Sequence, residues 1–196
     1  MTFDKICRRM HAFMRAFFNF FGEVTKIVIV ALLIVLPVRY FLVQPFFVRG
    51  ESMEPNFLDQ EYLLIDEISY RFSDPARGDV VVFHYPRNPS DYYIKRVIGL
   101  PGERLVGRDD KITVYSDAYP EGLVLDESVY LPAPEGLGAF EVQTLGEGEY
   151  FMVGDNRSRS YDSRRWGPMD KKYIVGKVWL VVWPFPRAQA VTAPTY

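Results

Sequence analysis

The chain has 196 residues, enough for one domain of about 150 residues with room for an additional segment. Hydrophobic residues make up 48% of the sequence and charged residues 24%, which excludes an intrinsically disordered chain. The net charge of −2 provides no basic footprint for nucleic acid. A single cysteine excludes an internal disulfide and a cysteine-ligated zinc cluster, and two histidines leave little material for a metal site. We therefore expect no metal, no cofactor and no nucleic-acid partner.

The beginning of the chain differs from the rest in charge and hydropathy. Residues 1–26 carry five Lys or Arg against two acidic residues, a balance of +3 that leaves −5 for residues 27–196. At the border, Ile27–Leu36 reads IVIVALLIVL, without a polar atom in any side chain. A basic leader, an apolar segment and an acidic body indicate that the two charged parts lie in different compartments.

The apolar segment is long enough for a membrane-spanning helix, which needs about 17–25 mostly apolar residues. Residues 24–43 reach that length if Lys26 and Arg39 extend their charges toward opposite interfaces. We predict a transmembrane anchor over residues 24–43, preceded by a basic, amphipathic leader over residues 1–23. Because positive residues favour the cytoplasmic side, the leader is expected in the cytoplasm and the rest of the chain outside.

Two other interpretations of the apolar segment remain. One is a buried core helix or strand of a soluble protein. The other is a cleavable signal peptide, which has a short charged region before the apolar core and small residues after it. Here the leader is 26 residues long and the sequence after the core, PVRYFLVQPFF, has no small residue for cleavage. This pattern favours an anchor that is retained.

After the anchor, the sequence is typical of β-structure. Short runs rich in β-branched and aromatic residues alternate with turn signals such as Asp74-Pro75 and Pro101-Gly102. No amphipathic helix of convincing length follows residue 60, so we expect a mostly β domain. The predicted strands are Tyr62–Ile65, Val80–Tyr85, Tyr92–Leu100, Ile112–Tyr115, Tyr150–Val153 and Ile174–Trp183.

Residues 103–149 are richer in glycine, proline and acidic residues, and their periodicity is weaker. We interpret them as an inserted subdomain. The β catalytic domain is then expected over residues 44–102 and 150–187, followed by a tail over residues 188–196.

Three polar segments are candidates for chemistry. In the first, GESMEP, Ser52 stands between Gly50 and Pro55, where neither a helix nor a regular strand extends far. In the second, DYYIKRVIG, two cations lie next to each other in a strand, so Lys95 and Arg96 point to opposite faces. One of them therefore faces the core or a cleft, and burial lowers the pKa of an ammonium group toward that of a general base.

The third segment, GDNRSRSYDSRRWG, follows an apolar strand and is dense in hydroxyl, carboxylate and guanidinium groups. Polar site residues concentrate in loops that a rigid scaffold holds. Each of the three segments also has an ordinary explanation, namely a turn serine, an exposed edge-strand lysine and a solvated loop.

Several familiar serine chemistries do not fit. A Ser-His-Asp triad needs a histidine outside the membrane, and only His84 qualifies, in a strand where we interpret it as structural. Ser52 has no glycine two residues later, as a nucleophile elbow requires, and Pro55 stands where an S-x-x-K motif has lysine. For a serine without a usable histidine, a lysine base is the remaining simple option.

Four motifs follow the apolar segment in order: GESMEP, RGDVVVFHYP, YIKRVIGLPGE and GDNRSRSYDSRRWG. This arrangement resembles the type I (leader) signal peptidases, over the anchor and residues 44–104 and 146–184. The resemblance implies a signal-peptidase-like antiparallel β catalytic domain with an N-terminal transmembrane helix. It also implies a membrane-bound serine endopeptidase that removes signal peptides from exported proteins after small residues (A-x-A), by a Ser/Lys dyad.

The resemblance carries over to individual residues. Ser52 falls on the position of the nucleophile, Lys95 on that of the general base and Ser160 on that of a second serine that orients the amine. The backbone N–H of Ser52 would donate to the oxyanion, and Gly50 stands where some members have an additional serine donor. Further supporting positions are Asp155, Asp162 and Arg164. Substrate contacts are implied for Phe46, Val48, Met53, Phe57, Val82, Tyr93 and Ile94, each of which plain core packing also explains.

This sequence departs from the family pattern at two further positions. Asn56 replaces a common threonine after the motif proline, and Tyr92 stands where an acidic residue is common. Neither is expected to contact the dyad, but Tyr92 is expected at the substrate rim.

The resemblance also implies partners and a location. We expect signal-peptide-bearing preproteins and the lipid bilayer as partners, a monomeric chain, and a single pass through the bacterial plasma membrane. Exposed aromatic residues would place the site against the bilayer, although core or rim packing explains them equally: Trp166, Trp179, Trp183 and Phe185. Two alternatives are a self-cleaving repressor, which would need a DNA-binding domain in place of residues 1–43, and a membrane-tethered β module without catalysis.

Overall fold

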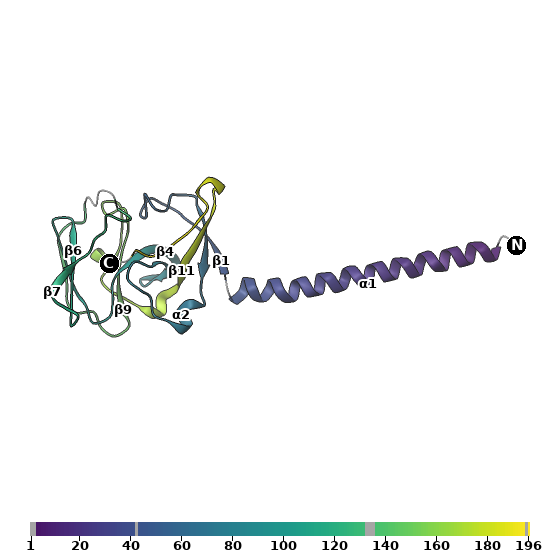
Figure 1. The fold of residues 1–196 in the computed structure, drawn as a ribbon, viewed down its shortest axis with the longest axis horizontal. Coiled ribbons are helices and arrows are strands. Elements are labelled where there is room, and N and C mark those ends of the chain that lie inside the picture. Colours follow the sequence, from purple (N-terminus) through teal and green to yellow (C-terminus); the bar gives the residue numbers. More distant parts are fainter. Residues whose placement is uncertain (1–2, 42, 132–135, 195) are drawn as a thin grey trace. The chain divides into compact units, whose positions relative to one another are not determined.

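The computed structural model describes residues 3–41, 43–131, 136–194 and 196. The chain forms two compact units, Met1–Leu42 and Val43–Tyr196. The first contains one helix, α1 (Phe3–Phe41), which is continuous in Figure 1. Within it, Phe17–Leu36 is long and apolar enough to cross a membrane, and no part of that stretch is buried inside the structure. A helix that is apolar all round and not covered by protein is typical of a membrane span.

The apolar stretch begins earlier than the anchor expected over residues 24–43. It includes the aromatic residues of Phe17–Phe21, which the sequence analysis assigned to the leader, and it contains the charged residues Glu23 and Lys26. The division between leader and anchor therefore remains a prediction.

The second unit is mostly antiparallel β-structure, as the sequence predicts (Figure 1). Its larger sheet has the strand order β1-β2-β11-β3-β4-β9-β10, and β12 pairs with β11. All pairs in this sheet are antiparallel, and β1 lies at its edge. The strands are β1 (Val43–Phe47), β2 (Tyr62–Asp66), β3 (Val80–Tyr85), β4 (Asn88–Gly99), β9 (Glu149–Val153), β10 (Met169–Asp170), β11 (Ile174–Trp183) and β12 (Gln189–Ala190).

The segment expected as an insertion builds a second, four-stranded sheet with the order β7-β6-β5-β8. Its strands are β5 (Arg104–Arg108), β6 (Lys111–Ser116), β7 (Tyr119–Val124) and β8 (Phe140–Val142). The apolar cluster beneath it also contains Ile98 of β4 and Phe151 of β9, so the second sheet packs onto the end of the first. The remaining helical elements are short: α2 (Ser69–Phe72), α3 (Ser163–Trp166), and the 3-10 turns η1 (Lys171–Tyr173) and η2 (Phe185–Arg187).

Strands β3 and β4 provide the rigid centre of the larger sheet. β3 lies between β11 and β4, and its run of apolar residues is buried on both faces, which explains why it does not alternate. β4 is exposed in its first half and buried from Lys95 onward. The burial of β4 therefore begins at the lysine that the sequence analysis selected.

Candidate active site

The turn after β1 presents Ser52. Gly50 adopts φ +91°, a conformation that favours glycine, and its N–H donates to Asp59 Oδ1 at 2.7 Å. After Ser52 the turn is fixed by burial, because Met53 and Phe57 are 1% and 3% exposed in the core. Ser52 is thus held between a hydrogen-bonded glycine and two buried anchors.

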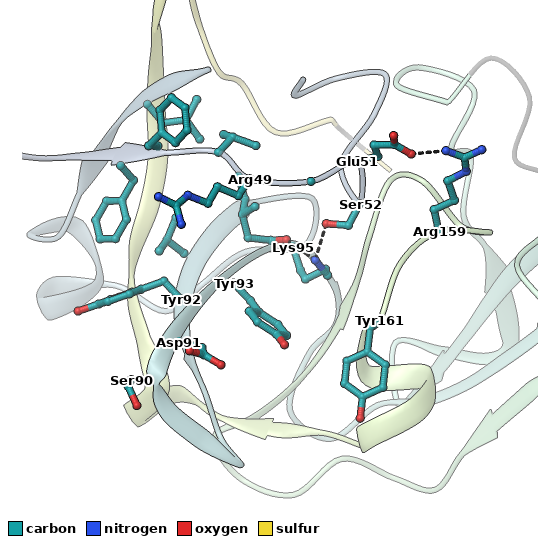
Figure 2. Close-up of a pocket in the computed structure, with 17 residues that line it drawn as sticks. Arg49, Glu51, Ser52, Ser90, Asp91, Tyr92, Tyr93, Lys95, Arg159 and Tyr161 are labelled. Atoms are coloured by element: carbon teal, nitrogen blue, oxygen red, sulfur yellow. Dashed lines mark hydrogen bonds and ion pairs between the residues drawn. The ribbon is translucent and has the colours of Figure 1, made fainter. Parts of the chain in front are cut away.

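Lys95 of β4 meets Ser52 directly, as Figure 2 shows. Its side chain is 4% exposed, and Nζ donates to Ser52 Oγ at 2.7 Å and to the carbonyl oxygen of Ile94 at 2.7 Å. The structure thus brings together the two residues, 43 positions apart in sequence, that the resemblance assigns to the dyad.

The surroundings of Lys95 favour the uncharged amine. Burial lowers the pKa of Lys95 from 10.5 to about 8, and Arg164 acts in the same direction. Asp162 and Asp155 oppose this effect and raise the pKa. An amine with a pKa near 8 is a base that can take a proton at near-neutral pH.

Arg96, the neighbouring cation, points away from Lys95 and is also buried. It forms two hydrogen bonds to Asp155, Nε to Oδ1 at 2.8 Å and Nη2 to Oδ2 at 2.6 Å. Asn56 Nδ2 donates to the same carboxylate at 2.8 Å, and the N–H of Asn156 donates to the carbonyl oxygen of Ser52 at 3.1 Å. The loop after β9 is therefore bonded both to β4 and to the turn that carries the serine.

Asp162 and Arg164 form a second pair in the same loop. Burial alone would raise the pKa of Asp162, but hydrogen bonds from Arg164 and from the N–H of Gly154 hold it below its ordinary value. The hydroxyl of Ser160 is buried and also lowers the pKa of Asp162, but it makes no hydrogen bond of ordinary geometry among the residues that the structure describes. Its role in orienting the amine of Lys95 therefore remains a prediction.

Gly154 explains how closely the loop approaches the dyad. A Cβ atom at this position would lie under 3.0 Å from both Ser160 Oγ and the carbonyl oxygen of Ser52. Only glycine lets the backbone of this loop pack against the nucleophile turn.

The dyad opens into a groove of about 690 Å³ between the β1 end of the sheet and the exposed half of β4 (Figure 2). Five of the seven expected substrate contacts line it: Phe46, Val48, Val82, Tyr93 and Ile94. Met53 and Phe57 do not, because both side chains point into the core under the nucleophile turn. Tyr92 lies at the rim as expected, where its ring contacts that of Phe46 with centroids 5.2 Å apart.

Sequence reasoning missed several residues of the groove. Glu51 and Arg159 form an ion pair beside Ser52, on the side away from Arg49 and Tyr92 (Figure 2). Both lie in motifs that the sequence analysis selected, but nothing in the sequence indicates that they pair. The other residues missed are Phe47, Arg49, Leu63, Ser90, Asp91 and Tyr161.

The remaining candidates have structural roles or are not assembled into a site. His84 Nδ1 lies 2.6 Å from the carbonyl oxygen of Pro89, away from Ser52, in agreement with the structural role expected from the sequence. Within the described part of the chain, no group of three or more His, Cys, Asp or Glu is placed to hold a metal ion. Trp166 is half-buried and packs against the core at Phe83, with ring centroids 6.0 Å apart.

Comparison with known proteins shows the family to which the chain is similar. The sequence profile of the family described as "Signal peptidase, peptidase S26" matches residues 21–183. A probable signal peptidase I-2 of Synechocystis sp. is 34% identical over 179 residues, which cover 89% of this chain and 78% of that protein. Signal peptidase IB of Staphylococcus aureus is 36% identical over 166 residues, covering 80% of this chain and 86% of that protein.

Among solved structures, a signal peptidase I from Enterococcus faecalis V583 is 32% identical, with a TM-score of 0.44 over 54% of this chain and 97% of that one. The extent of the family match and the identity to the curated relatives settle the assignment. They place the chain among enzymes rather than among non-catalytic membrane modules or repressors. This chain belongs to the signal peptidase I family of S26 serine endopeptidases.

Proposed function

We propose that this chain is a membrane-anchored signal peptidase that cleaves exported preproteins after A-x-A, with Ser52 as nucleophile and Lys95 as general base. The observation that carries the proposal is the 2.7 Å contact between Ser52 Oγ and a lysine amine that is 4% exposed. Burial lowers the pKa of this amine, so the base is available near neutral pH.

The mechanism follows from that contact. The neutral amine takes the proton of Ser52 as Oγ attacks the scissile carbonyl carbon, and the ammonium then gives the proton to the leaving amine. A water that the same amine activates adds to the ester carbonyl, and the ester bond to Ser52 breaks as its oxygen recovers a proton. The mature protein leaves in the first half of the reaction, and the signal peptide leaves with a free carboxylate in the second.

The oxyanion of each tetrahedral intermediate needs donors. The N–H of Ser52 has no backbone acceptor among the residues that the structure describes, so it is free for this role. Gly50 supplies no side-chain donor, and the loss of one donor costs about 10²–10³ in rate. We infer that a second donor comes from the turn backbone or from water.

Substrate selection is explained by the shape of the groove. β1 pairs only with β2, so its outer edge retains backbone groups to which an extended peptide can bind as a further strand. Apolar side chains from Phe46, Val82 and Ile94 line the groove, which supports a preference for small apolar residues at −1 and −3. These two positions point to the same side of an extended peptide.

The proposed location rests on the helix and on an aromatic surface. Phe47 and Tyr62 are register partners with ring centroids 4.9 Å apart, and Tyr62 is also the register partner of Trp183. Trp183 contacts Phe185, which is 75% exposed. Such a continuous surface across β1, β2 and β11 suits the interface of the bilayer on the outer side, where a signal peptide emerges.

The test is cleavage of a purified A-x-A precursor by full-length chain in lipid vesicles. Ser52→Ala and Lys95→Ala should each lower kcat/KM by at least about 10³-fold while leaving precursor binding intact. Ser158→Ala, an exposed hydroxyl in the loop after β9, and Lys111→Ala, an exposed lysine of β6, are the controls and should keep wild-type activity. Wild-type cleavage by either dyad variant would disprove the proposal.

A further inference from the structure

Two buried residues of the inserted segment reach the loop after β9. Glu127 and Tyr130 follow β7, outside the second sheet, and are 5% and 9% exposed. A tight turn fixes them, because the N–H groups of Tyr130 and Leu131 both donate to the carbonyl oxygen of Glu127. Neither belongs to the groove or to the dyad, and the mechanism above gives them no role.

Glu127 holds Arg157 with two hydrogen bonds, from Nη1 to Oε2 at 2.9 Å and from Nη2 to Oε1 at 2.6 Å. The two side chains are 3% and 1% exposed, so neither charge has access to water. Arg157 Nε donates in turn to the carbonyl oxygen of Gly154 at 3.1 Å. Gly154 is the residue that packs directly against Ser52 and Ser160. One ion pair therefore fixes the backbone on which the dyad rests.

Tyr130 is connected to the same region by three different groups. Its hydroxyl donates to Glu127 Oε1 at 2.5 Å, and its ring lies 4.0 Å from the guanidinium of Arg96, which holds Asp155. Its carbonyl oxygen accepts a hydrogen bond from Asn56 Nδ2 at 2.9 Å. Asn56, one of the departures from the family pattern, thus connects the nucleophile turn to Tyr130 and to Asp155.

We propose that Glu127 and Tyr130 are positioning residues, which hold the loop that carries Gly154 against the nucleophile turn. The inserted segment then contributes to the geometry of the reaction and not only to the fold. The inference rests on the proposed function, because it assigns these residues to the reaction of Ser52 and Lys95.

The decisive variant replaces the whole ion pair, Glu127→Leu with Arg157→Met. Removal of one partner alone would leave a buried charge and unfold the segment, whereas an apolar pair of similar volume keeps the fold stable. We expect a thermal unfolding midpoint near that of the wild type, a kcat lower by about 10–100-fold and a KM within about threefold, because small misplacements of reacting groups act on kcat.

Tyr130→Phe provides a second variant that does not disturb packing. It retains the ring over Arg96 and loses the hydroxyl bond to Glu127 and the one accepted from Tyr196, so we expect kcat to fall by about 3–10-fold without a change in KM. The control is Arg104→Gln, which breaks the exposed ion pair with Glu141 in the second sheet and should leave kcat unchanged.

A readout that needs no catalysis is hydrogen exchange of the peptide that contains Asn156, whose N–H donates to the carbonyl oxygen of Ser52. We expect faster exchange in the double variant Glu127→Leu with Arg157→Met than in the wild type. A double variant with wild-type kcat, or with unchanged exchange at Asn156, overturns the inference. Failure of the wild-type chain to cleave any precursor would instead overturn the proposed function, and the exchange measurement would still decide whether Glu127 holds the loop.

Discussion

Lys95 combines two properties that oppose each other energetically. Its amine is enclosed by protein and hydrogen-bonded to Ser52 Oγ, which suits a base, but enclosure also penalises the charged form of the amine at neutral pH. Asp162 and Asp155 only partly offset that penalty, and Arg164 adds to it. Lys95, the proposed base, is therefore expected to reduce the stability of the fold.

Lys95→Met tests this expectation. The pKa of the amine is about 8 in the folded chain against 10.5 for an unperturbed lysine. The unfolded chain therefore binds the proton more tightly, which costs the fold on the order of 3 kcal/mol below pH 8. This cost disappears as the pH rises from 8 to 10.5. The two lost hydrogen bonds oppose the gain by about 1 kcal/mol each.

We therefore expect Lys95→Met to have a higher free energy of unfolding than the wild type at pH 7, measured by denaturant titration. The difference should decrease and change sign toward pH 10. A variant that is less stable than the wild type by a constant amount at every pH would show that the amine carries no burial penalty.

For single residues, the sequence predicted which side chains form the candidate site but not all the contacts that they make. Alternation along β4 predicted that Lys95 and Arg96 point to opposite faces, and in the structure both are buried with separate partners. The partners come from segments more than 40 residues away, and no local pattern encodes such pairings. Met53 and Phe57 were expected in the groove but lie in the core. The sequence does not distinguish the two places, because an apolar side chain near a nucleophile fits a pocket and a core equally well.

The strands show where sequence patterns are informative. The predicted bounds Val80–Tyr85 and Ile174–Trp183 are confirmed without change, because both runs are apolar and bordered by turn residues. β5, β7 and β8 were missed, as were the two-residue strands β10 and β12. β5 and β7 contain glycine, β7 also contains proline, and β8 has only three residues, which weakens the strand signal. The second sheet depends on packing against β4 and β9 rather than on strong local propensity.

The strands also form the walls of the groove, and Val82→Ala tests the role of these walls. Val82 of β3 is 3% exposed and lines the groove, so removal of two methyl groups should enlarge the space for −1 or −3. We compare kcat/KM for a precursor with valine at these positions with kcat/KM for a precursor with alanine there. In the Val82→Ala variant this ratio should rise by at least about 10-fold over the wild type. Competition between the two precursors in one reaction measures this ratio.

Val81→Ala is the matched control. The same change is made one residue earlier on β3, but Val81 packs in a different apolar cluster, away from the groove. It should lower stability to a similar extent and leave the ratio unchanged. If the ratio changed equally in both variants, or did not change in Val82→Ala, the assignment of Val82 to substrate selection would be contradicted.

At the scale of the whole molecule, the two units differ in charge and composition. The change from a basic, apolar beginning to an acidic β-rich body coincides with the division between Met1–Leu42 and Val43–Tyr196. The side of the membrane on which each unit lies follows in our proposal from that charge distribution. Of the four aromatic residues considered for bilayer contact, Trp166 of α3 is half-buried against the core, whereas Trp179, Trp183 and Phe185 of β11 and η2 are exposed.

Contact of the aromatic surface with lipid is tested by Trp183→Ser combined with Phe185→Ser. These side chains are 48% and 75% exposed, so their loss should not destabilise the fold appreciably. We expect kcat/KM for a precursor to fall by about fivefold in lipid vesicles and to stay unchanged in detergent micelles. Tyr119→Ser, an exposed aromatic of the second sheet, is the control. Equal activity of the double variant in both media would contradict the proposed bilayer contact.

The most direct measurement is the rate of a single turnover of an A-x-A precursor as a function of pH, under conditions in which the chemical step is observed. In our proposal the neutral amine of Lys95 is the base, so the rate should rise from acid pH with a midpoint near pH 8. Lys95→Arg, whose guanidinium stays charged, should be inactive throughout this range. A wild-type rate that stays flat from pH 5 to pH 9 would contradict the account.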